Sequence, residues 1–117
     1  MTDVIFRAPI LQLLRNRGMS PTWLYRFSWR SGVSGLAEHC LDVPFWFDCL
    51  SEGRVAALAG PAAPQTLAAE MHGRAVRFIA TGEPGWPAWD ASAQSDRVFD
   101  DPSTTGTKGY AGAAPLI

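Results

Sequence analysis

The stretch Gly35-Leu36-Ala37-Glu38-His39-Cys40-Leu41-Asp42-Val43-Pro44-Phe45-Trp46-Phe47 decides how the fold of this chain is interpreted. It follows the run from Trp23 to Trp29, in which a large aromatic residue recurs at every second position. This alternation predicts a β-strand with one aromatic face. Arg26 and Ser28 lie on the other face, which favours a place near a sheet edge. His39 then lies in a loop beyond a strand end, where reactive groups gather in open α/β sheets.

Helices are predicted on both sides of this stretch. Residues 2–17 have an apolar stripe, and Pro9 within it predicts a kinked or two-part helix. Residues 64–81 have apolar side chains at the three-and-four spacing of an amphipathic helix, which Gly82 should end. The remaining expected elements are a short apolar segment at 43–47, one or two helical turns within 48–60, and a short final strand at 97–100.

The composition bounds the class of protein. The chain has 117 residues, of which 47% are hydrophobic and 18% charged, enough for one small globular domain. A net charge of −1 gives no electrostatic reason for binding nucleic acid or an anionic membrane. No apolar run approaches the roughly 20 residues that cross a bilayer, and the N-terminus does not resemble a signal peptide. We therefore expect no nucleic-acid or membrane partner, and the cytoplasm as the default location.

Three segments, taken in order, resemble one known family. They are Thr2-Asp3 with Phe6-Arg7-Ala8-Pro9, then Tyr25–Trp29 with Gly35–Phe47, and finally Met71-His72, Val76-Arg77-Phe78 and Thr81–Asp90. They are similar to the C-terminal part of the type-B carboxylesterases, the family that also contains the cholinesterases and the bacterial para-nitrobenzyl esterases.

The resemblance implies an α/β fold that is a C-terminal fragment of an α/β-hydrolase. Its elements would be a helix, a strand, the histidine loop, a long helix and a possible short final strand. Residues 1–103 would belong to the hydrolase domain. Residues 104–117 are rich in Gly, Ala and Thr and show no period, so we expect a flexible tail there.

The resemblance also implies a role for His39. In a serine esterase a serine oxygen attacks the ester carbonyl, a histidine takes and returns the proton, and a carboxylate orients the histidine. In α/β-hydrolases these residues follow the chain order serine, acid, histidine, so a C-terminal fragment would keep the histidine alone. By resemblance, His39 is the general base.

The other parts of such a site are not evident in the sequence. The chain contains no Gly-x-Ser-x-Gly pentapeptide, and Gly32–Leu36 lacks the final glycine. We therefore interpret Ser31 and Ser34 as loop residues. Glu38 and Asp42 are interpreted as solvated or loop-holding groups, because a triad acid normally comes from another strand end. An oxyanion hole would also have to come from elsewhere.

No cofactor or metal is expected, because the mechanism needs neither. A disulfide between Cys40 and Cys49 would close a very short loop, so buried free thiols are favoured. A metal site formed by these cysteines and the two histidines would need scattered ligands to converge, without any usual zinc spacing. His72 is expected at the boundary of the long helix, and Trp86 in packing at its exit.

Two functions remain open. The first is a carboxylic-ester hydrolase represented only by the portion that carries His39 and is inactive alone. Its partner would be a separate N-terminal piece with the serine nucleophile, and the ester substrate would bind only the complete enzyme. The alternative is a non-catalytic interaction module, or a truncated product, that keeps the inherited fold. Open strand edges would then favour self-association.

Overall fold

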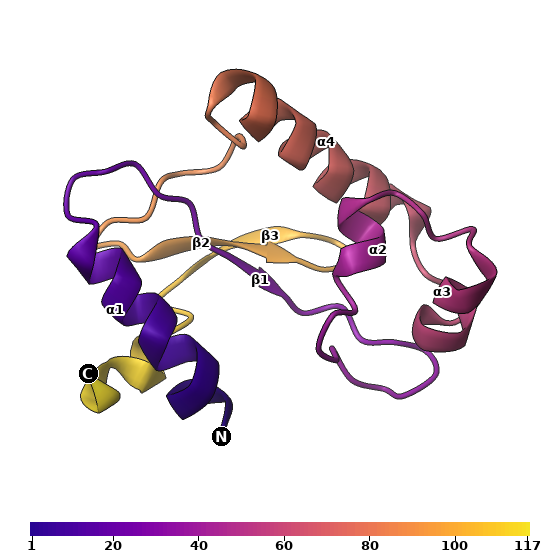
Figure 1. Ribbon diagram of the computed structural model, residues 1–117, viewed down its shortest axis with the longest axis horizontal. Coiled ribbons are helices and arrows are strands. Elements are labelled where there is room, and N and C mark those ends of the chain that lie inside the picture. Colours follow the sequence, from indigo (N-terminus) through magenta and orange to yellow (C-terminus); the bar gives the residue numbers. More distant parts are fainter. The chain divides into compact units, whose positions relative to one another are not determined.

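The computed structural model describes residues 1–117, which form helices and three strands (Figure 1). In chain order the elements are η1 (Asp3–Arg7, a π-helix), α1 (Ala8–Asn16), β1 (Tyr25–Phe27), α2 (Val43–Trp46), α3 (Gly53–Ala59), α4 (Gln65–Thr81), β2 (Ser95–Phe99), β3 (Thr104–Thr107) and η2 (Ala111–Leu116, a 3-10 helix). None of the helices combines the length and the apolarity that crossing a bilayer requires.

The three strands form one sheet in the order β1-β2-β3. The amide of Ser28 donates to the carbonyl of Phe99 at 2.9 Å, and that of Arg97 to the carbonyl of Leu24 at 3.0 Å. Residue numbers rise together on both sides of this pairing, so β1 and β2 are parallel and need the crossover through α2, α3 and α4. The short connection from β2 to β3 makes an antiparallel hairpin. β1 is therefore an edge strand, as its polar second face predicted.

The chain divides into two compact units. The first comprises Met1–Arg26, Trp86–Arg97 and Thr105–Ile117, and the second comprises Phe27–Gly85 and Val98–Thr104.

The N-terminal helix of the first unit has two parts, as the proline predicted. Pro9 lies in the first turn of α1, which follows η1 directly, so the residue that lacks an N–H falls where the hydrogen-bond pattern changes from the π type to the α type. The π-helix η1 precedes this turn. α1 ends at Asn16, and Gly18 follows with a φ of +57°. The apolar core of the unit consists of Leu11, Leu14 and Leu24, with Ile10, Trp89, Tyr110 and Ala114 packed against it.

The second unit is built on α4 and the short helix α2. The core-facing residues are Leu41, Phe45, Leu67, Ala68, Met71 and Phe99, all buried. The ring of Phe45 contacts Phe27 and Trp29, with centroids 5.2 and 5.3 Å apart, and these aromatic pairs connect β1 to α2. α4 ends as predicted at Gly82, whose amide donates to the carbonyl of Phe78 at 2.8 Å. The predicted stripe is buried only in its first half, since Phe78 and Ile79 are exposed.

Residues 104–117 differ from the flexible tail expected from composition. They contain β3 and η2, and Ala113 within η2 is completely buried. Tyr110 contacts the first unit's core, and its hydroxyl donates to the carbonyl of Tyr25 at 3.3 Å. A segment of small residues without hydrophobic periodicity can therefore form regular structure here. Strand pairing and a few buried contacts stabilise it.

Candidate functional site

His39 lies at the start of the turn that leads into α2, and its side chain is exposed. The turn is closed by backbone hydrogen bonds from Leu41 to Glu38 at 3.1 Å and from Val43 to Cys40 at 3.2 Å. Leu41 is completely buried two residues after His39 and anchors the turn. Cys40 has a φ of +65°, a left-handed conformation that is uncommon outside glycine. The structure thus presents an exposed imidazole on a turn with a fixed, strained backbone.

The loop before this turn is held to the end of α3. The buried hydroxyl of Ser31 donates to the carbonyl of Leu58 at 2.6 Å and accepts the amide of Val33 at 3.0 Å. The amide of Gly32 donates to the carbonyl of Ala59 at 3.4 Å. These bonds satisfy carbonyls at a helix C-terminus that have no intrahelical partner. Ser31 therefore has the loop-holding position that the sequence indicated, with its hydroxyl directed at a backbone carbonyl.

The second serine and the two acids also belong to the local turns. The hydroxyl of Ser34 is exposed and accepts the amide of Leu36 at 3.3 Å. Glu38 closes the histidine turn through its carbonyl. The carbonyl of Asp42 accepts the amides of Phe45 and Trp46 at 3.1 and 3.0 Å, which begins α2. Both acids thus take part in holding this segment through their backbone.

His72 connects α4 to α2. Its Nδ1 lies 2.9 Å from the carbonyl of Trp46, and the side chain is exposed. Since a carbonyl only accepts hydrogen bonds, Nδ1 carries the proton in this contact. After α4, the indole N–H of Trp86 donates to the carbonyl of Leu24 at 3.0 Å within the first unit. Both residues have packing and tethering contacts that suit the structural roles expected for them.

Both cysteines are free thiols, but the expectation that they are buried is wrong. Cys40 is exposed and Cys49 is half-buried, because the turn that buries Leu41 directs its neighbour outward. No group of three or more His, Cys, Asp or Glu side chains converges anywhere in the chain.

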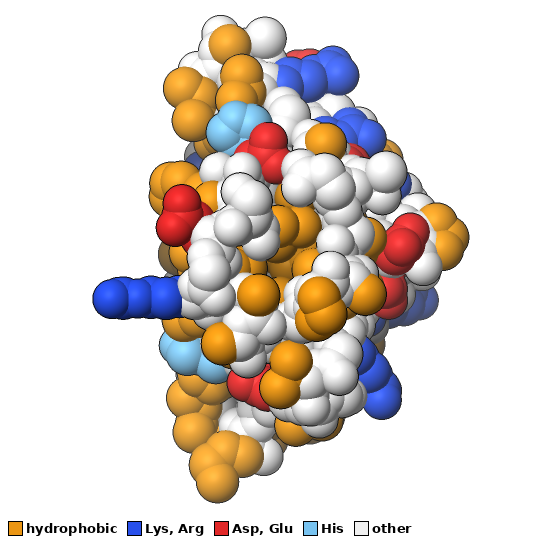
Figure 2. Space-filling model, turned by 90° about the vertical axis from the view of Figure 1, so that its right-hand side faces the viewer, with side chains coloured by type: hydrophobic (Ala, Val, Ile, Leu, Met, Phe, Trp, Pro, Cys, Tyr) orange, Lys and Arg blue, Asp and Glu red, His pale blue; other side chains and the backbone are white.

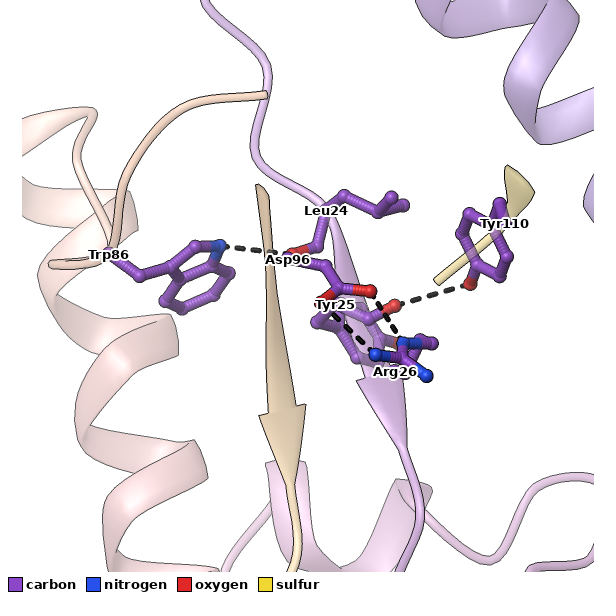
Figure 3. Close-up of polar contacts among 6 residues, drawn as sticks. All are labelled: Leu24, Tyr25, Arg26, Trp86, Asp96 and Tyr110. Atoms are coloured by element: carbon purple, nitrogen blue, oxygen red, sulfur yellow. Dashed lines mark hydrogen bonds and ion pairs between the residues drawn. The ribbon is translucent and has the colours of Figure 1, made fainter. Parts of the chain in front are cut away.

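Sequence reasoning missed a buried polar cluster in the first unit (Figure 3). Asp96 on β2 is completely buried and accepts hydrogen bonds from Nε and Nη2 of Arg26 on β1, the second at 3.3 Å. The guanidinium of Arg7 lies over the Tyr110 ring, 5.7 Å from its centroid. Burial raises the pKa of the Tyr110 hydroxyl above its ordinary value. The one available signal was Arg26 in an aromatic strand, since an arginine that is partly buried there favours a carboxylate partner.

Among solved structures, esterases match this chain over nearly its whole length. A PNB esterase superposes with a TM-score of 0.84 at 22% identity, over 97% of this chain and 25% of its own. The Geobacillus stearothermophilus carboxylesterase EST55 matches at 25% identity with a TM-score of 0.82, over 98% of this chain and 26% of its own. An esterase from the anaerobe Clostridium hathewayi that can hydrolyse aliphatic aromatic polyesters matches at 23% identity with a TM-score of 0.81, over 96% and 24%.

No family model matches the chain. The chain spans about a quarter of the length of the esterases that it matches. Over nearly its whole length, the chain therefore has the fold of one portion of a type-B carboxylesterase, an α/β-hydrolase.

Proposed function

We propose that this chain supplies the general base of a carboxylic-ester hydrolase, with His39 in that role. The observation that carries the proposal is the exposed imidazole on a turn anchored by the buried Leu41, in a chain with a carboxylesterase fold. Cys40 strengthens it, because strained left-handed residues cluster at functional sites. Histidine is also the side chain best suited to exchanging protons near neutral pH.

The chemistry assigned to His39 has two proton transfers in each half of the reaction. The imidazole takes the proton of a serine hydroxyl as that oxygen bonds to the ester carbonyl carbon. It then gives the proton to the departing alcohol oxygen, leaving an acyl-serine. In the second half, the imidazole takes a proton from water and returns it to the serine when the acid leaves. A fixed turn favours these steps because the base must remain within hydrogen-bond reach of both oxygens.

In this proposal the serine and the carboxylate come from outside this chain, since it has no Gly-x-Ser-x-Gly pentapeptide and the hydroxyls of Ser31 and Ser34 serve the loop. The isolated chain is therefore inactive in this proposal. We would purify it and measure hydrolysis of a chromogenic short-chain ester. Robust turnover that disappears in His39→Ala would mean that the chain contains its own nucleophile, which contradicts the assignment.

Activity is tested in a chimaera in which this chain replaces the matching quarter of the G. stearothermophilus carboxylesterase. His39→Ala should lower kcat/KM for the ester by about 10³-fold or more. The control is His72→Gln, which keeps a donor for the Trp46 carbonyl and should stay within about threefold. Equal activity of the His39→Ala chimaera and its parent would show that another residue is the base.

A second candidate is a non-catalytic interaction module. It is favoured by β1, which has a neighbouring strand on one side only. Such an edge pairs readily with another chain. The mass of the purified protein in solution tests this candidate. A monomer at every concentration, with sharp cooperative melting, would count against partnering through the edge.

A further inference from the structure

Two arginines of α4 converge on the turn that follows the helix. Arg74 and Arg77 are three residues apart, so they lie on the same side of α4. The Nη1 atoms of both lie within 3.0 Å of the point that a Cβ on Gly85 would occupy. The two guanidinium groups therefore meet beside this glycine. All three residues belong to the second unit.

The turn has the geometry that this approach requires. Gly82 ends α4 with a φ of +80°, and the chain then folds back beside the end of the helix (Figure 1). Nη1 of Arg74 donates to the carbonyls of Pro84 and Gly85, at 3.2 and 2.7 Å, which fixes one of the two guanidinium groups. Gly85 has a φ of +95° and no side chain, so both groups can come close to its backbone.

The positive charge of this arginine pair has no negative partner within the chain. The two ion pairs of the protein lie elsewhere, one in η1 and one between β1 and β2. Glu83 belongs to the same turn, but it is exposed and forms no ion pair with either arginine. The Arg77 side chain makes no hydrogen bond, and that of Arg74 uses only Nη1. Because arginine has donors on Nε and on both Nη atoms, most donors of the pair remain available to a ligand.

The attraction for anions is local and is not a property of the whole surface. The net charge of the chain is −1, and Figure 2 shows basic and acidic side chains interspersed over the face that it presents. Two adjacent guanidinium groups, in contrast, bring two positive charges together. One tetrahedral dianion would neutralise both charges, and its oxygens would accept the paired N–H groups. A carboxylate would neutralise only one of them.

We propose that Arg74 and Arg77 bind a phosphate group, as its dianion, on the surface beside Gly85. Arg74 supplies the guanidinium that the turn holds in place, and Arg77 supplies the second one, which has no other partner. Inorganic phosphate and a small phosphate monoester share this chemistry. The site is independent of the proposed function, since it contains neither His39 nor any residue of the histidine turn.

The probes are inorganic phosphate and glycerol 3-phosphate, titrated into the full 117-residue chain at about pH 7.5 and constant ionic strength. A phosphate monoester is mainly a dianion at this pH, because its second pKa is about 6. Calorimetry measures binding directly, and a rise of Tm with ligand concentration measures it by linkage. We expect one saturable site, with acetate bound about tenfold more weakly or less tightly still.

The first pair of variants tests the charge. Arg77→Gln should weaken phosphate binding about tenfold, because it removes one of the two charged donors. The control is Arg54→Gln on α3, which removes the same charge from an exposed arginine of the same unit. It should change the affinity by less than about twofold.

The second pair of variants tests the convergence on the turn. In Gly85→Ala the new Cβ would displace both guanidinium groups, which are the ends of flexible side chains, so binding should weaken about tenfold in a folded protein. The matched control is Gly82→Ala, which also places a Cβ on a left-handed residue of this turn but has no atom within 4 Å of it. It should leave the affinity within about twofold of the parent.

The outcomes decide the proposal. Saturable binding that is weakened in Arg77→Gln and Gly85→Ala but kept in both controls supports it. Within that result, an ester bound at least as tightly as inorganic phosphate identifies an organic phosphate as the ligand, and binding of inorganic phosphate alone identifies the free ion. Equal effects of Arg77→Gln and Arg54→Gln, acetate bound as tightly as phosphate, or a signal that does not saturate would overturn it. If Gly85→Ala does not fold, Arg77→Gln and Arg54→Gln decide alone, since both arginines are exposed and form no ion pair.

Discussion

Asp96 on β2 is completely buried, and its carboxylate accepts two hydrogen bonds from the guanidinium of Arg26 on the neighbouring parallel strand. The Arg26 side chain is itself 28% exposed, so one partner remains in contact with water while the other does not. Gly109 lies so close to both that a Cβ there would clash with Arg26 and Asp96. The ion pair therefore connects two strands that are far apart in sequence and leaves no space beside it.

Removing the buried carboxylate should destabilise the protein strongly. We expect Asp96→Asn to lower the free energy of unfolding by about 2–4 kcal/mol, because the guanidinium loses its charged partner. The control is Asp3→Asn in the exposed pair of Arg7 and Asp3, with side chains 40% and 44% exposed, which should cost about 1 kcal/mol or less. Urea unfolding measures both. If the two substitutions lowered the free energy of unfolding equally, burial would not determine how much an ion pair contributes to stability.

Tyr110 should make the free energy of unfolding depend on pH in the alkaline range. Burial raises the pKa of its hydroxyl above the ordinary 10.0, and the charge of Asp96 also raises it. Arg7 and Arg26 act in the opposite direction. The unfolded chain therefore ionises first, so this stabilisation is complete below pH 10 and is lost as pH rises through the higher folded pKa. Between pH 8 and pH 11, the free energy of unfolding should fall less steeply with pH in Tyr110→Phe than in the parent protein. Identical slopes in the two proteins would show that Tyr110 does not cause this pH dependence.

Two glycines of one helix should respond to alanine with opposite signs. Gly82 follows α4 with a φ of +80°, where a Cβ is strained, so Gly82→Ala should destabilise by about 1 kcal/mol. Gly73 lies inside α4, with open space around its missing Cβ, so Gly73→Ala should stabilise by up to about 1 kcal/mol. Thermal melting of the two variants beside the parent checks the signs. If Gly73→Ala destabilised the protein instead, the space around this glycine would not be open, and the prediction would be wrong.

Ser31 should matter for stability and not for chemistry. Its buried hydroxyl contacts Leu58 and Val33, so Ser31→Ala should cost about 1–3 kcal/mol. The exposed Ser34 is the matched control, and Ser34→Ala should cost about 0.5 kcal/mol or less. Denaturant unfolding measures both values. Neither serine should react with a fluorophosphonate probe, and covalent labelling of the isolated chain at either would identify a nucleophile.

The sequence predicted those elements that local signals define. The apolar spacing of residues 64–81 and the glycine after them predicted α4 (Gln65–Thr81) to within one residue, and Pro9 predicted a first helix in two parts. The aromatic run predicted a strand, although the strand itself is limited to Tyr25–Phe27. The position of this strand at an edge followed from its polar second face. Each of these depends on residues close together in the chain.

What the sequence did not reveal depends on distant partners. β3 is Thr-Thr-Gly-Thr, mostly exposed, and becomes a strand because β2 lies beside it. Asp96 is buried because Arg26 meets it from another strand, and no spacing rule signals that encounter. The second half of α4 keeps the amphipathic spacing, yet Phe78 and Ile79 are exposed there, so the spacing alone did not tell where burial ends. For the candidate site, the role proposed for His39 came from the resemblance, whereas the anchoring of its turn by the buried Leu41 required the structure.

The parallel pairing of β1 with β2 has a consequence for how the chain reaches its native state. The hairpin of β2 and β3 can form from residues close together in the chain, but β1 must pair with β2 across the intervening residues 28–94. Closing so long a loop loses chain entropy before any strand pairing compensates for it. Because this contact joins residues far apart in the chain, it slows folding, and β1 has no paired strand until β2 reaches it. In refolding, amide protons of the hairpin should become protected early, and those of β1 only with the final cooperative step.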